Sequence, residues 1–311
     1  MSFIARMSER RWWKAVWSSV LVSLGLRVQA QELRTVAIDS VRSIFQIVNF
    51  QSSFVSARNV DLYIPPDYDS LNTYRLLIMQ DGQNLFCPEH AFQNEVLGLD
   101  LCMERNQIRD VIIAGVWNTT DRFREYLPNK IYHALKRKDR KLIRNEYGGS
   151  ALGDPYLQFI KDELIPDLRS RYPISNDPKD IVIGGISMGA LIAFYAAIQN
   201  PDIFGSSLCL STHWPLSVMQ HKTSIEHAYL PVLHQYISGL KSGSFYFDRG
   251  DENIDAWYEH AQKDVDDWMK RTLPNPDQQL MSRVFKASGH EMKDWSARID
   301  VPVRFIFING E

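Results

Sequence analysis

The segment from Asp180 to Ile198 reads Asp-Ile-Val-Ile-Gly-Gly-Ile-Ser-Met-Gly-Ala-Leu-Ile-Ala-Phe-Tyr-Ala-Ala-Ile. Its first part is a β-branched run that predicts a strand, and its last part is apolar and rich in alanine, which predicts a helix. Between them, residues 185–189 form a G-x-S-x-G sequence centred on Ser187. A strand, a tight turn and a helix in this order expose the serine hydroxyl beside the N–H groups of the helix start. We therefore predict that Ser187 is a nucleophile. A glycine-rich turn with a surface serine is the alternative.

Apolar stretches that predict strands recur along residues 31–311, with helical patterns between many of them. Strands that alternate with helices imply a mostly parallel sheet covered on both faces, so we predict a single α/β domain. A short polar link joins the first two predicted strands, which we expect to form an antiparallel edge. The predicted strands are Val41–Val48, Val60–Ile64, Arg75–Gln80, Val111–Trp117, Ile181–Gly184, Ser206–Leu210, Ser244–Phe247, Met281–Phe285 and Val303–Ile308.

Two helices are marked clearly in the sequence. Asp154 is expected to cap the first, with Pro155 at its first position and an apolar stripe behind it. The second is expected to run from about Asp255 to Arg271. The stripe of the first helix consists of Leu157, Ile160, Leu164 and Leu168.

A basic segment, Leu127–Gly149, interrupts this alternation. Its apolar residues Ile131, Leu135 and Leu142 have helical spacing, so we predict a short amphipathic helix within a cap or flap at residues 118–150. Loops at the carboxyl edge of a parallel sheet border the ligand crevice, and a basic flap there would favour an anionic substrate. A solvated surface helix is the alternative. The basic residues are Lys130, Lys136, Arg137, Lys138, Arg140, Lys141 and Arg144.

Residues 1–30 have the pattern of a secretory signal peptide: a basic leader, an apolar run from Ala15 to Leu26, and Val28-Gln29-Ala30 as a cleavage site. We expect a secreted or periplasmic protein whose mature chain, residues 31–311, is not stably inserted in a membrane. An uncleaved N-terminal anchor is the alternative. The formal net charge of −2 gives no sign of nucleic-acid binding.

The chain contains three cysteines. Export would permit a disulfide between Cys87 and Cys102, which lie in one stretch. Three free buried thiols, with Cys209 as the third, are the alternative. Their spacing is not that of a zinc site.

A nucleophilic serine needs a base and an acid that orients it, in the chain order serine, acid, histidine in one large class of hydrolases. His290 is the only histidine among the last fifty residues, and it follows a late predicted strand. We predict that it is the base. Asp248, Asp251 and Asp255 all follow the Ser244–Phe247 strand, and each remains a candidate for the acid.

The tetrahedral intermediate of acyl transfer needs two N–H donors. The backbone amide of Met188, directly after the serine, is expected to be one of them. The stretch Asp81-Gly82-Gln83-Asn84 follows an earlier predicted strand and is expected to supply the other. A plain turn between strand and helix is the alternative for that stretch.

These motifs resemble the putative-esterase group of α/β-hydrolases, which includes enterochelin-esterase-like proteins, esterase D, feruloyl and acetyl-xylan esterases and the mycolyltransferases. The resemblance extends along nearly the whole mature chain. The matching stretches are Val60–Tyr68, Asp81–Phe86, Gly148-Gly149 with Tyr156, Phe159 and Glu163–Pro166, Gly184–Ala190, and Gly289-His290 with Trp295.

The resemblance implies an α/β-hydrolase fold with Ser187 as nucleophile, His290 as base and the amide of Gln83 in the oxyanion hole. It favours Asp255 as the acid, although the stretch before it is two residues longer than the family pattern. It also places Arg122 in a substrate-side loop. Asp81 and Trp214 are further predicted substrate-binding residues, and Trp214 would line an aromatic cleft with Trp117, His213 and Trp257.

The sequence therefore predicts a serine esterase that needs neither a metal nor an organic cofactor. The expected substrate is a small-molecule or oligosaccharide ester, either carbohydrate-linked or a siderophore. The alternatives are an acyltransferase of the mycolyltransferase type and a binding module without turnover. The oligomeric state cannot be read from the sequence.

Overall fold

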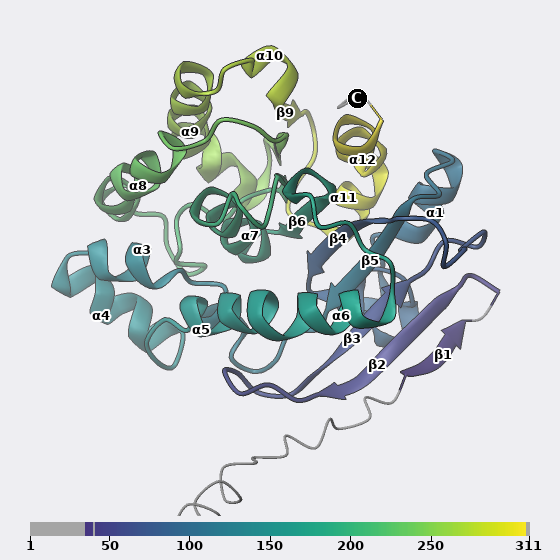
Figure 1. The fold of residues 1–311 in the computed structure, drawn as a ribbon. Coiled ribbons are helices and arrows are strands. Elements are labelled where there is room, and N and C mark those ends of the chain that lie inside the picture. The colour runs from purple at the N-terminus through teal and green to yellow at the C-terminus, as the bar shows by residue number, and fades with distance from the viewer. Residues whose placement is uncertain (1–34, 40, 309–311) are drawn as a thin grey trace, which may run out of the picture. The chain divides into compact units, whose positions relative to one another are not determined.

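The computed structural model describes residues 35–39 and 41–308 of the chain. A nine-stranded sheet with the order β1-β2-β3-β5-β4-β6-β7-β8-β9 runs through these residues (Figure 1). Strand β1 is antiparallel to β2, β2 is antiparallel to β3, and β3 is antiparallel to β5. All other neighbouring strands are parallel, which confirms the predicted α/β-hydrolase architecture with an antiparallel N-terminal edge. The strands are β1 (Thr35–Asp39), β2 (Ile44–Phe50), β3 (Arg58–Tyr63), β4 (Arg75–Gln80), β5 (Val111–Val116), β6 (Ile181–Ile186), β7 (Ser206–Leu210), β8 (Phe245–Gly250) and β9 (Leu280–Phe285).

The predicted signal peptide, residues 1–30, lies outside the described residues. Within the part of the chain that the structure describes, no helix combines the length and the apolar character needed to cross a membrane.

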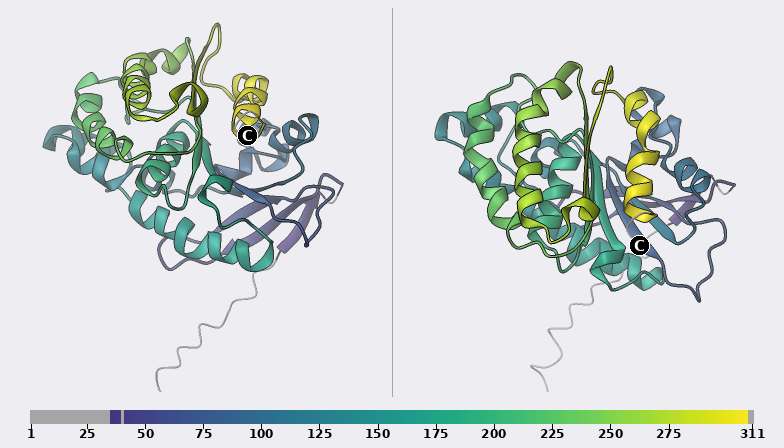
Figure 2. Two further views of the ribbon diagram at one scale, coloured as in Figure 1. Left: turned by 45° about the horizontal axis from the view of Figure 1, so that its top comes forward. Right: turned by 90° about the horizontal axis from the view of Figure 1, so that it is seen from above.

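Helices cover both faces of the sheet, as its edge-on view in Figure 2 shows. Helix α7 packs against β6 and β7 on one face, on the same side as α8 and α9, while α12 and α1 cover the other. The helices are α1 (Leu99–Arg105), α2 (Arg122–Glu125), α3 (Asn129–Ala134), α4 (Arg137–Glu146), α5 (Gly153–Gln158), α6 (Ile165–Arg171), α7 (Met188–Gln199), α8 (Thr223–Ile237), α9 (Glu259–Thr272), α10 (Pro276–Gln279), α11 (Met292–Arg298) and α12 (Asp300–Phe307), with a π-helical turn over Phe159–Leu164 and 3-10 turns that include Gly82–Asn84 and Asn253–Tyr258.

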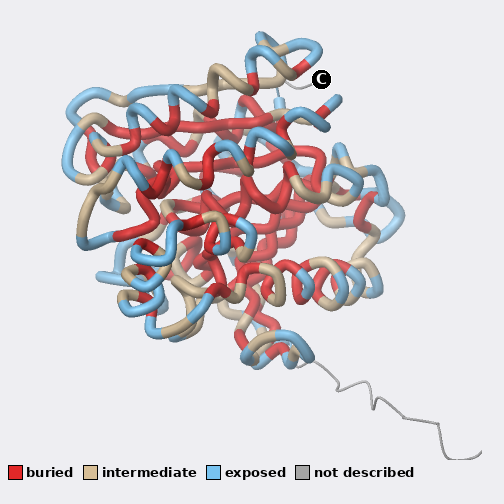
Figure 3. Tube along the Cα trace, turned by 90° about the vertical axis from the view of Figure 1, so that its left-hand side faces the viewer, coloured by how far each residue is buried: buried red, intermediate tan, exposed pale blue. Residues whose placement is uncertain are grey.

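The central strands and α7 form the core of the sheet. Every residue of β5 and β6 is buried, because helices cover both faces of these parallel strands. In α7, all residues from Met188 to Ile198 are buried, as expected for a helix that is apolar on all sides. The buried segments form a continuous interior (Figure 3).

The parallel strands bring distant parts of the chain to one edge. β4, β6, β7 and β8 are consecutive neighbours in the sheet and run in the same direction, so their carboxyl ends lie along the same edge. Asp81, Ser187 and Ser211 each directly follow one of these ends. The loop after β8 begins there as well.

One strand prediction needs correction, and one strand was missed. The segment Val303–Ile308 was predicted as a strand but lies mainly in helix α12, which packs against β8 and β7. A short apolar run does not distinguish a buried strand from a buried helix, and here Val303, Phe305 and Ile306 face the sheet interior from a helix. Strand β1 was not predicted.

The helix predictions also differ in detail. Asp154 was predicted as an N-cap, but α5 begins at Gly153 after Leu152, and no side chain caps it. The predicted apolar stripe of this helical stretch is buried throughout. The basic segment contains two helices instead of one, because the backbone is extended at Leu135 between α3 and α4. That the segment closes over the site stays a prediction.

Candidate active site

Ser187 lies in a strained turn between β6 and α7. Its backbone has φ 60° and ψ −121°, a conformation that a residue with a side chain rarely adopts and that is typical of functional sites. The glycines on both sides permit the turn. A Cβ at Gly185 would lie 2.5 Å from the carbonyl carbon of Gly189, and a Cβ at Gly189 would lie 2.9 Å from Cβ of Gln80. The two glycines therefore allow a turn in which the Ser187 backbone departs from both strand and helix geometry.

His290 approaches the serine from the loop between β9 and α11. Its Nε2 atom lies 3.0 Å from Oγ of Ser187, although 103 positions separate the two residues. The Nδ1 atom lies 2.6 Å from Oδ1 of Asp255. His290 is partly buried, with 17% of its side chain exposed, whereas the Asp255 side chain is fully buried. The three side chains thus form a hydrogen-bonded chain that ends at the serine hydroxyl.

Among the three candidate acids, Asp255 is the one within hydrogen-bond distance of His290. It lies in the 3-10 turn after β8, and its Oδ2 accepts hydrogen bonds from the Gly250 amide at 2.7 Å and the Ser211 hydroxyl at 2.6 Å. Asp251 instead pairs with Lys286 near the surface at 3.2 Å, which lowers the pKa of Asp251. The two aspartates are four residues apart yet have different surroundings.

Asp248 is also fully buried but belongs to another pair. Its carboxylate accepts hydrogen bonds from Nε and Nη2 of Arg298, at 3.1 and 3.0 Å, and one from the Tyr246 hydroxyl. Burial raises the pKa of Asp248, and Arg298 opposes this rise. Asp248 therefore serves as the counter-ion that holds Arg298 beneath the loop.

Ser211 and Arg298 are residues that the sequence analysis missed. The Ser211 hydroxyl donates to Asp255 and accepts from Nη2 of Arg298 and Nε1 of Trp295, both at 2.9 Å. The network fixes one face of the Asp255 carboxylate. A serine after β7 and an arginine on α11 carry no local signal for this role, because the contact depends on residues far apart in the chain.

Tyr258 and His213 form a second polar pair beside the serine. The Tyr258 hydroxyl lies 2.8 Å from Nδ1 of His213 and 3.5 Å from Nδ1 of His290. The backbone amide of His213 donates to the Ser187 carbonyl at 3.2 Å. Burial, aided by the nearby His290, lowers the pKa of His213 to about 3, so its ring stays neutral. From the sequence, His213 was predicted only to line the aromatic cleft, and no role was predicted for Tyr258.

The two predicted amide donors lie within the first two residues of helical turns at neighbouring strand ends. Met188 is the first residue of α7, and Gln83 lies in the 3-10 turn Gly82–Asn84 after β4. The first N–H groups of a helix have no acceptor within it. A Cβ on Gly189 would contact Gln80 and approach Asp81 Oδ2 to 3.4 Å, so the two turns are packed together. Both amides therefore lie at the same carboxyl edge of the sheet as Ser187.

Asp81 and Arg122 are bonded to each other. Nε and Nη2 of Arg122 donate to the two carboxylate oxygens of Asp81, each at 2.7 Å, and the Asn118 amide donates to Oδ1 at 2.6 Å. The Tyr126 hydroxyl lies 3.2 Å from the Asp81 amide nitrogen. Burial disfavours the charged guanidinium, yet the attraction of Asp81 outweighs it and raises the pKa of Arg122. The Asp81–Arg122 pair stabilises the loop that carries Gln83. Contact of Asp81 or Arg122 with the substrate stays a prediction.

A family model described as putative esterase matches residues 52–306 of the chain. The chain belongs to the putative esterase family. Among curated proteins, it is 26% identical over 159 residues to the uncharacterized protein YbbA of Bacillus subtilis (strain 168), which covers 50% of this chain and 58% of YbbA. The chain thus spans about three fifths of the curated relatives it matches.

Solved structures of esterases share the fold of this putative esterase. An IroE-like serine hydrolase from Shewanella oneidensis is 18% identical, with a TM-score of 0.61, and the match covers 88% of this chain and 80% of that one. The enterobactin esterase FES from Shigella flexneri was solved in the presence of 2,3-dihydroxy-N-benzoyl-glycine. It is 16% identical with a TM-score of 0.56, and the match covers 84% of this chain and 57% of that one. At these identities the likeness concerns the fold.

The predicted role of Trp214 as a residue lining a substrate cleft needs correction. Trp214 is fully buried, its Nε1 donates to Gln262 at 3.0 Å, and its ring packs on Phe194 and Phe247. It is a core residue without access to a ligand. The sequence offered no means to see this, because tryptophan is common both in cores and at binding surfaces.

Two further histidines, His221 and His234, pack against neighbouring side chains. His221 pairs with Glu226 at 3.0 Å and stacks on Trp257, and His234 stacks on Trp268. All three cysteines are buried and free, so Cys87 and Cys102 form no disulfide.

Proposed function

We propose that the protein is a serine esterase that cleaves a carboxylic ester through Ser187, His290 and Asp255. The observation that carries this proposal is the unbroken hydrogen-bonded chain from the Asp255 carboxylate through both His290 nitrogens to the Ser187 hydroxyl. Membership of the putative esterase family supports it. The arrangement matches what a serine nucleophile needs: a base within hydrogen-bond reach and a third group that orients the base.

In the first half of the proposed reaction, Ser187 Oγ forms a bond to the ester carbonyl carbon while its proton passes to Nε2 of His290. The tetrahedral intermediate collapses when the bond to the alcohol oxygen breaks and His290 returns the proton to that oxygen. Asp255 accepts the Nδ1–H of His290 throughout, which fixes the tautomer and stabilises the transient imidazolium. The product is an acyl-enzyme.

The negative charge that develops on the carbonyl oxygen would be held by the amides of Gln83 and Met188. Both amides belong to the starts of helical turns, and the α7 dipole adds a favourable potential at the same point. Removal of one such donor from an oxyanion hole costs about 3–4 kcal/mol of transition-state stabilisation.

In the second half, a water oxygen bonds to the acyl carbon while His290 takes a proton from the water. The bond between the acyl carbon and Ser187 Oγ then breaks, His290 returns the proton to Oγ, and the acid product leaves. An alcohol in place of water would give acyl transfer, the second candidate reaction. Product analysis with added alcohol or sugar acceptors separates the two outcomes.

We propose a carbohydrate-linked ester or a siderophore ester as substrate. The fold neighbour named as an enterobactin esterase supports the siderophore class only as an analogy of fold. A panel of acetyl-xylan, feruloyl and catecholate-siderophore esters decides between the classes. Export, which we propose from residues 1–30, is tested by locating the protein in cell fractions.

Hydrolysis of p-nitrophenyl butyrate tests the reaction itself. The expected result is turnover by the wild type and a loss of about 10³-fold or more in Ser187→Ala. Ser170→Ala is the matched control, because Ser170 is an exposed serine on α6 whose hydroxyl only donates to the Asp167 carbonyl. Equal rates in Ser187→Ala and the wild type would refute the proposal.

A further inference from the structure

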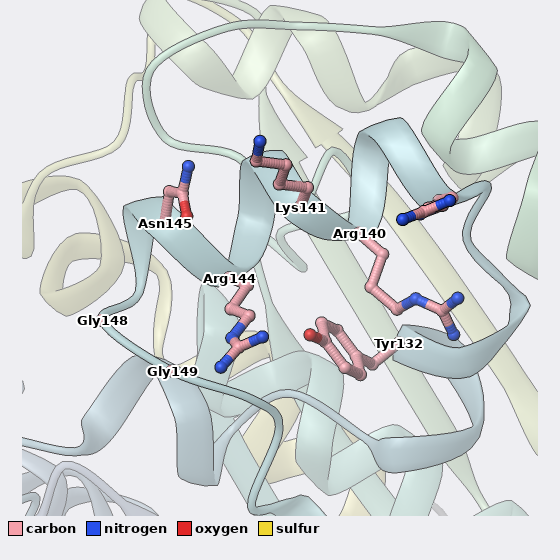
Figure 4. Close-up of a pocket in the computed structure, with 8 residues that line it drawn as sticks. Tyr132, Arg140, Lys141, Arg144, Asn145, Gly148 and Gly149 are labelled. Atoms are coloured by element: carbon pink, nitrogen blue, oxygen red, sulfur yellow. The ribbon is translucent and has the colours of Figure 1, made fainter.

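A strongly basic cavity lies between α3, α4 and the turn that follows α4. Its volume is about 820 Å³, within the range of sites that hold small organic ligands. Four of its eight lining residues are cationic, and none is acidic. The lining consists of Tyr132, Arg137, Arg140, Lys141, Arg144, Asn145, Gly148 and Gly149 (Figure 4).

The four cations share one face of α4. Arg140, Lys141 and Arg144 follow Arg137 by three, four and seven positions, which is the spacing of a single helical face. Like charges at this spacing repel each other and destabilise the helix, and Arg137 in the first turn is also at the unfavourable end of the helix dipole. A bound anion would relieve this repulsion.

Within the described residues, these four side chains have no ion-pair partner, whereas two neighbouring cations have specific contacts. Arg124 pairs with Asp121 at 2.8 Å and donates to the Ser150 carbonyl at 3.0 Å. Lys130 on α3 donates to the Tyr236 hydroxyl and lies over its ring. The positive charge of the cavity is therefore uncompensated by the protein.

Arg137, Lys141 and Arg144 are exposed to solvent. In Figure 4, Lys141 points away from Tyr132, whereas Arg140 and Arg144 extend toward its side of α4. In Figure 4, the guanidinium of Arg144 and the hydroxyl of Tyr132 point toward one another beneath α4. Tyr132 is buried, with 5% of its surface exposed, so the ring provides a fixed wall. Arg140 and Arg144 are one helical turn apart, and each guanidinium can bind a separate oxyanion with two N–H donors.

The end of α4 carries Tyr147, which contacts the Met188 side chain. The helix ends with Gly148 at φ +70°, and the Gly149 amide donates to the Arg144 carbonyl at 2.9 Å, the pattern of a Schellman cap. Tyr147, between the helix and this turn, donates to the Leu216 carbonyl and lies 3.7 Å from Sδ of Met188. Gly148, which lines the cavity, thus directly follows a residue that contacts Met188.

We propose that this cavity binds a multiply charged oxyanion portion of the ester substrate, built from phosphate or carboxylate groups. The inference rests on the proposed esterase function and adds the charge class of the substrate. A smaller cavity of about 470 Å³ beside α4 shares Lys141 and Asn145 with the first but includes Asp139, whose carboxylate makes it less suited to an anion.

Binding of tripolyphosphate, measured by calorimetry at low salt, tests the cavity without requiring turnover. The wild type is expected to bind it, more weakly as NaCl is added, because salt screens exposed charges. The double variant Arg140→Gln/Arg144→Gln is expected to bind about tenfold more weakly. Lys263→Gln is the control, since Lys263 is exposed and pairs only with Asp267 on α9. Binding that is absent in the wild type, or equal in the double variant, would overturn the inference.

A series of p-nitrophenyl esters tests whether the anion belongs to the substrate. Acyl chains of increasing length, each with a terminal carboxylate, are compared with neutral chains of equal length. We expect the ratio of kcat/KM for the charged over the neutral ester to rise at one chain length and to fall about tenfold in the double variant. A ratio that does not depend on chain length or on the two arginines would refute the substrate assignment. Failure of the proposed function would look different, as a rate unaffected by Ser187→Ala.

Discussion

The carboxylate of Asp255 uses its two oxygens differently: Oδ1 lies 2.6 Å from Nδ1 of His290, and Oδ2 accepts hydrogen bonds from the Ser211 hydroxyl and the Gly250 amide. An acid held in this way cannot rotate away from the histidine. The orientation of His290 toward Ser187 is therefore set by Ser211, directly after β7, and by Gly250, at the end of β8, as well as by its own loop.

Asp255→Asn tests this orientation. The asparagine side chain fills the same space but can donate a hydrogen bond to Nδ1, which would hold His290 in the wrong tautomer. We expect kcat for p-nitrophenyl butyrate to fall about 10³–10⁴-fold with the fold intact. Asp251→Asn is the matched control, because Asp251 pairs with Lys286. A larger loss in Asp251→Asn than in Asp255→Asn would assign the acid role to Asp251.

His213 predicts a dependence of stability on pH. Its pKa in the folded protein is about 3, below the ordinary value of 6.5, because the ring is buried. Between these two values the unfolded chain binds a proton that the folded chain does not, so stability falls as the pH falls. From about pH 7.5 to pH 5, this group should lower the free energy of unfolding by about 2 kcal/mol.

Urea unfolding of the wild type and His213→Asn at both pH values measures this contribution. The variant removes the titrating ring, so its stability should fall less between the two pH values than that of the wild type. The same loss in both proteins would show that His213 does not titrate on unfolding.

Loss of the Arg122–Asp81 pair is expected to lower stability more than loss of an exposed ion pair. Arg122→Gln leaves the buried Asp81 carboxylate without its bidentate partner, which should cost about 3 kcal/mol of unfolding free energy. Arg105→Gln, which breaks the exposed pair with Asp300, should cost no more than about 1 kcal/mol. Chemical denaturation compares the two. Equal costs would mean that the Asp81–Arg122 pair contributes no more than a surface pair does.

Gly185→Ala tests the strained turn. Its new methyl group would lie 2.5 Å from a backbone carbon of Gly189, so the turn must shift. We expect a loss of about 1–3 kcal/mol in stability and, because a displacement of about 1 Å misplaces the serine, about 10²-fold in kcat/KM. Gly239→Ala is the control, since its methyl group would have its nearest neighbour at 3.4 Å. Full activity in Gly185→Ala would show that the turn tolerates a side chain there.

The elements that the sequence predicted well are those with a local signal. The strand, turn and helix around Ser187 follow from β-branched residues, two glycines and an alanine-rich run, all within 19 positions. The parallel sheet follows from the alternation of such segments. By contrast, Val303–Ile308 carries the same apolar signal in a helix as it would in a strand, and only packing against β7 and β8 decides between them.

The site shows the same division. The sequence left three aspartates open, and the choice depends on how the loop after β8 turns, which brings Asp255 to His290 and sends Asp251 to Lys286. Ser211, Arg298 and Tyr258 act through contacts with residues distant in the chain, so no motif marked them. Trp214 was predicted near the ligand, but burial depends on the whole fold.

Covalent labelling with a fluorophosphonate tests the central claim, that Ser187 is an activated nucleophile, most directly. The intact mass of the wild-type protein should rise by one phosphonyl adduct, and peptide mapping should locate the adduct on Ser187. Labelling should be lost in Ser187→Ala and strongly slowed in His290→Ala. An unmodified wild-type protein, or an adduct on another residue that persists in Ser187→Ala, would contradict the account.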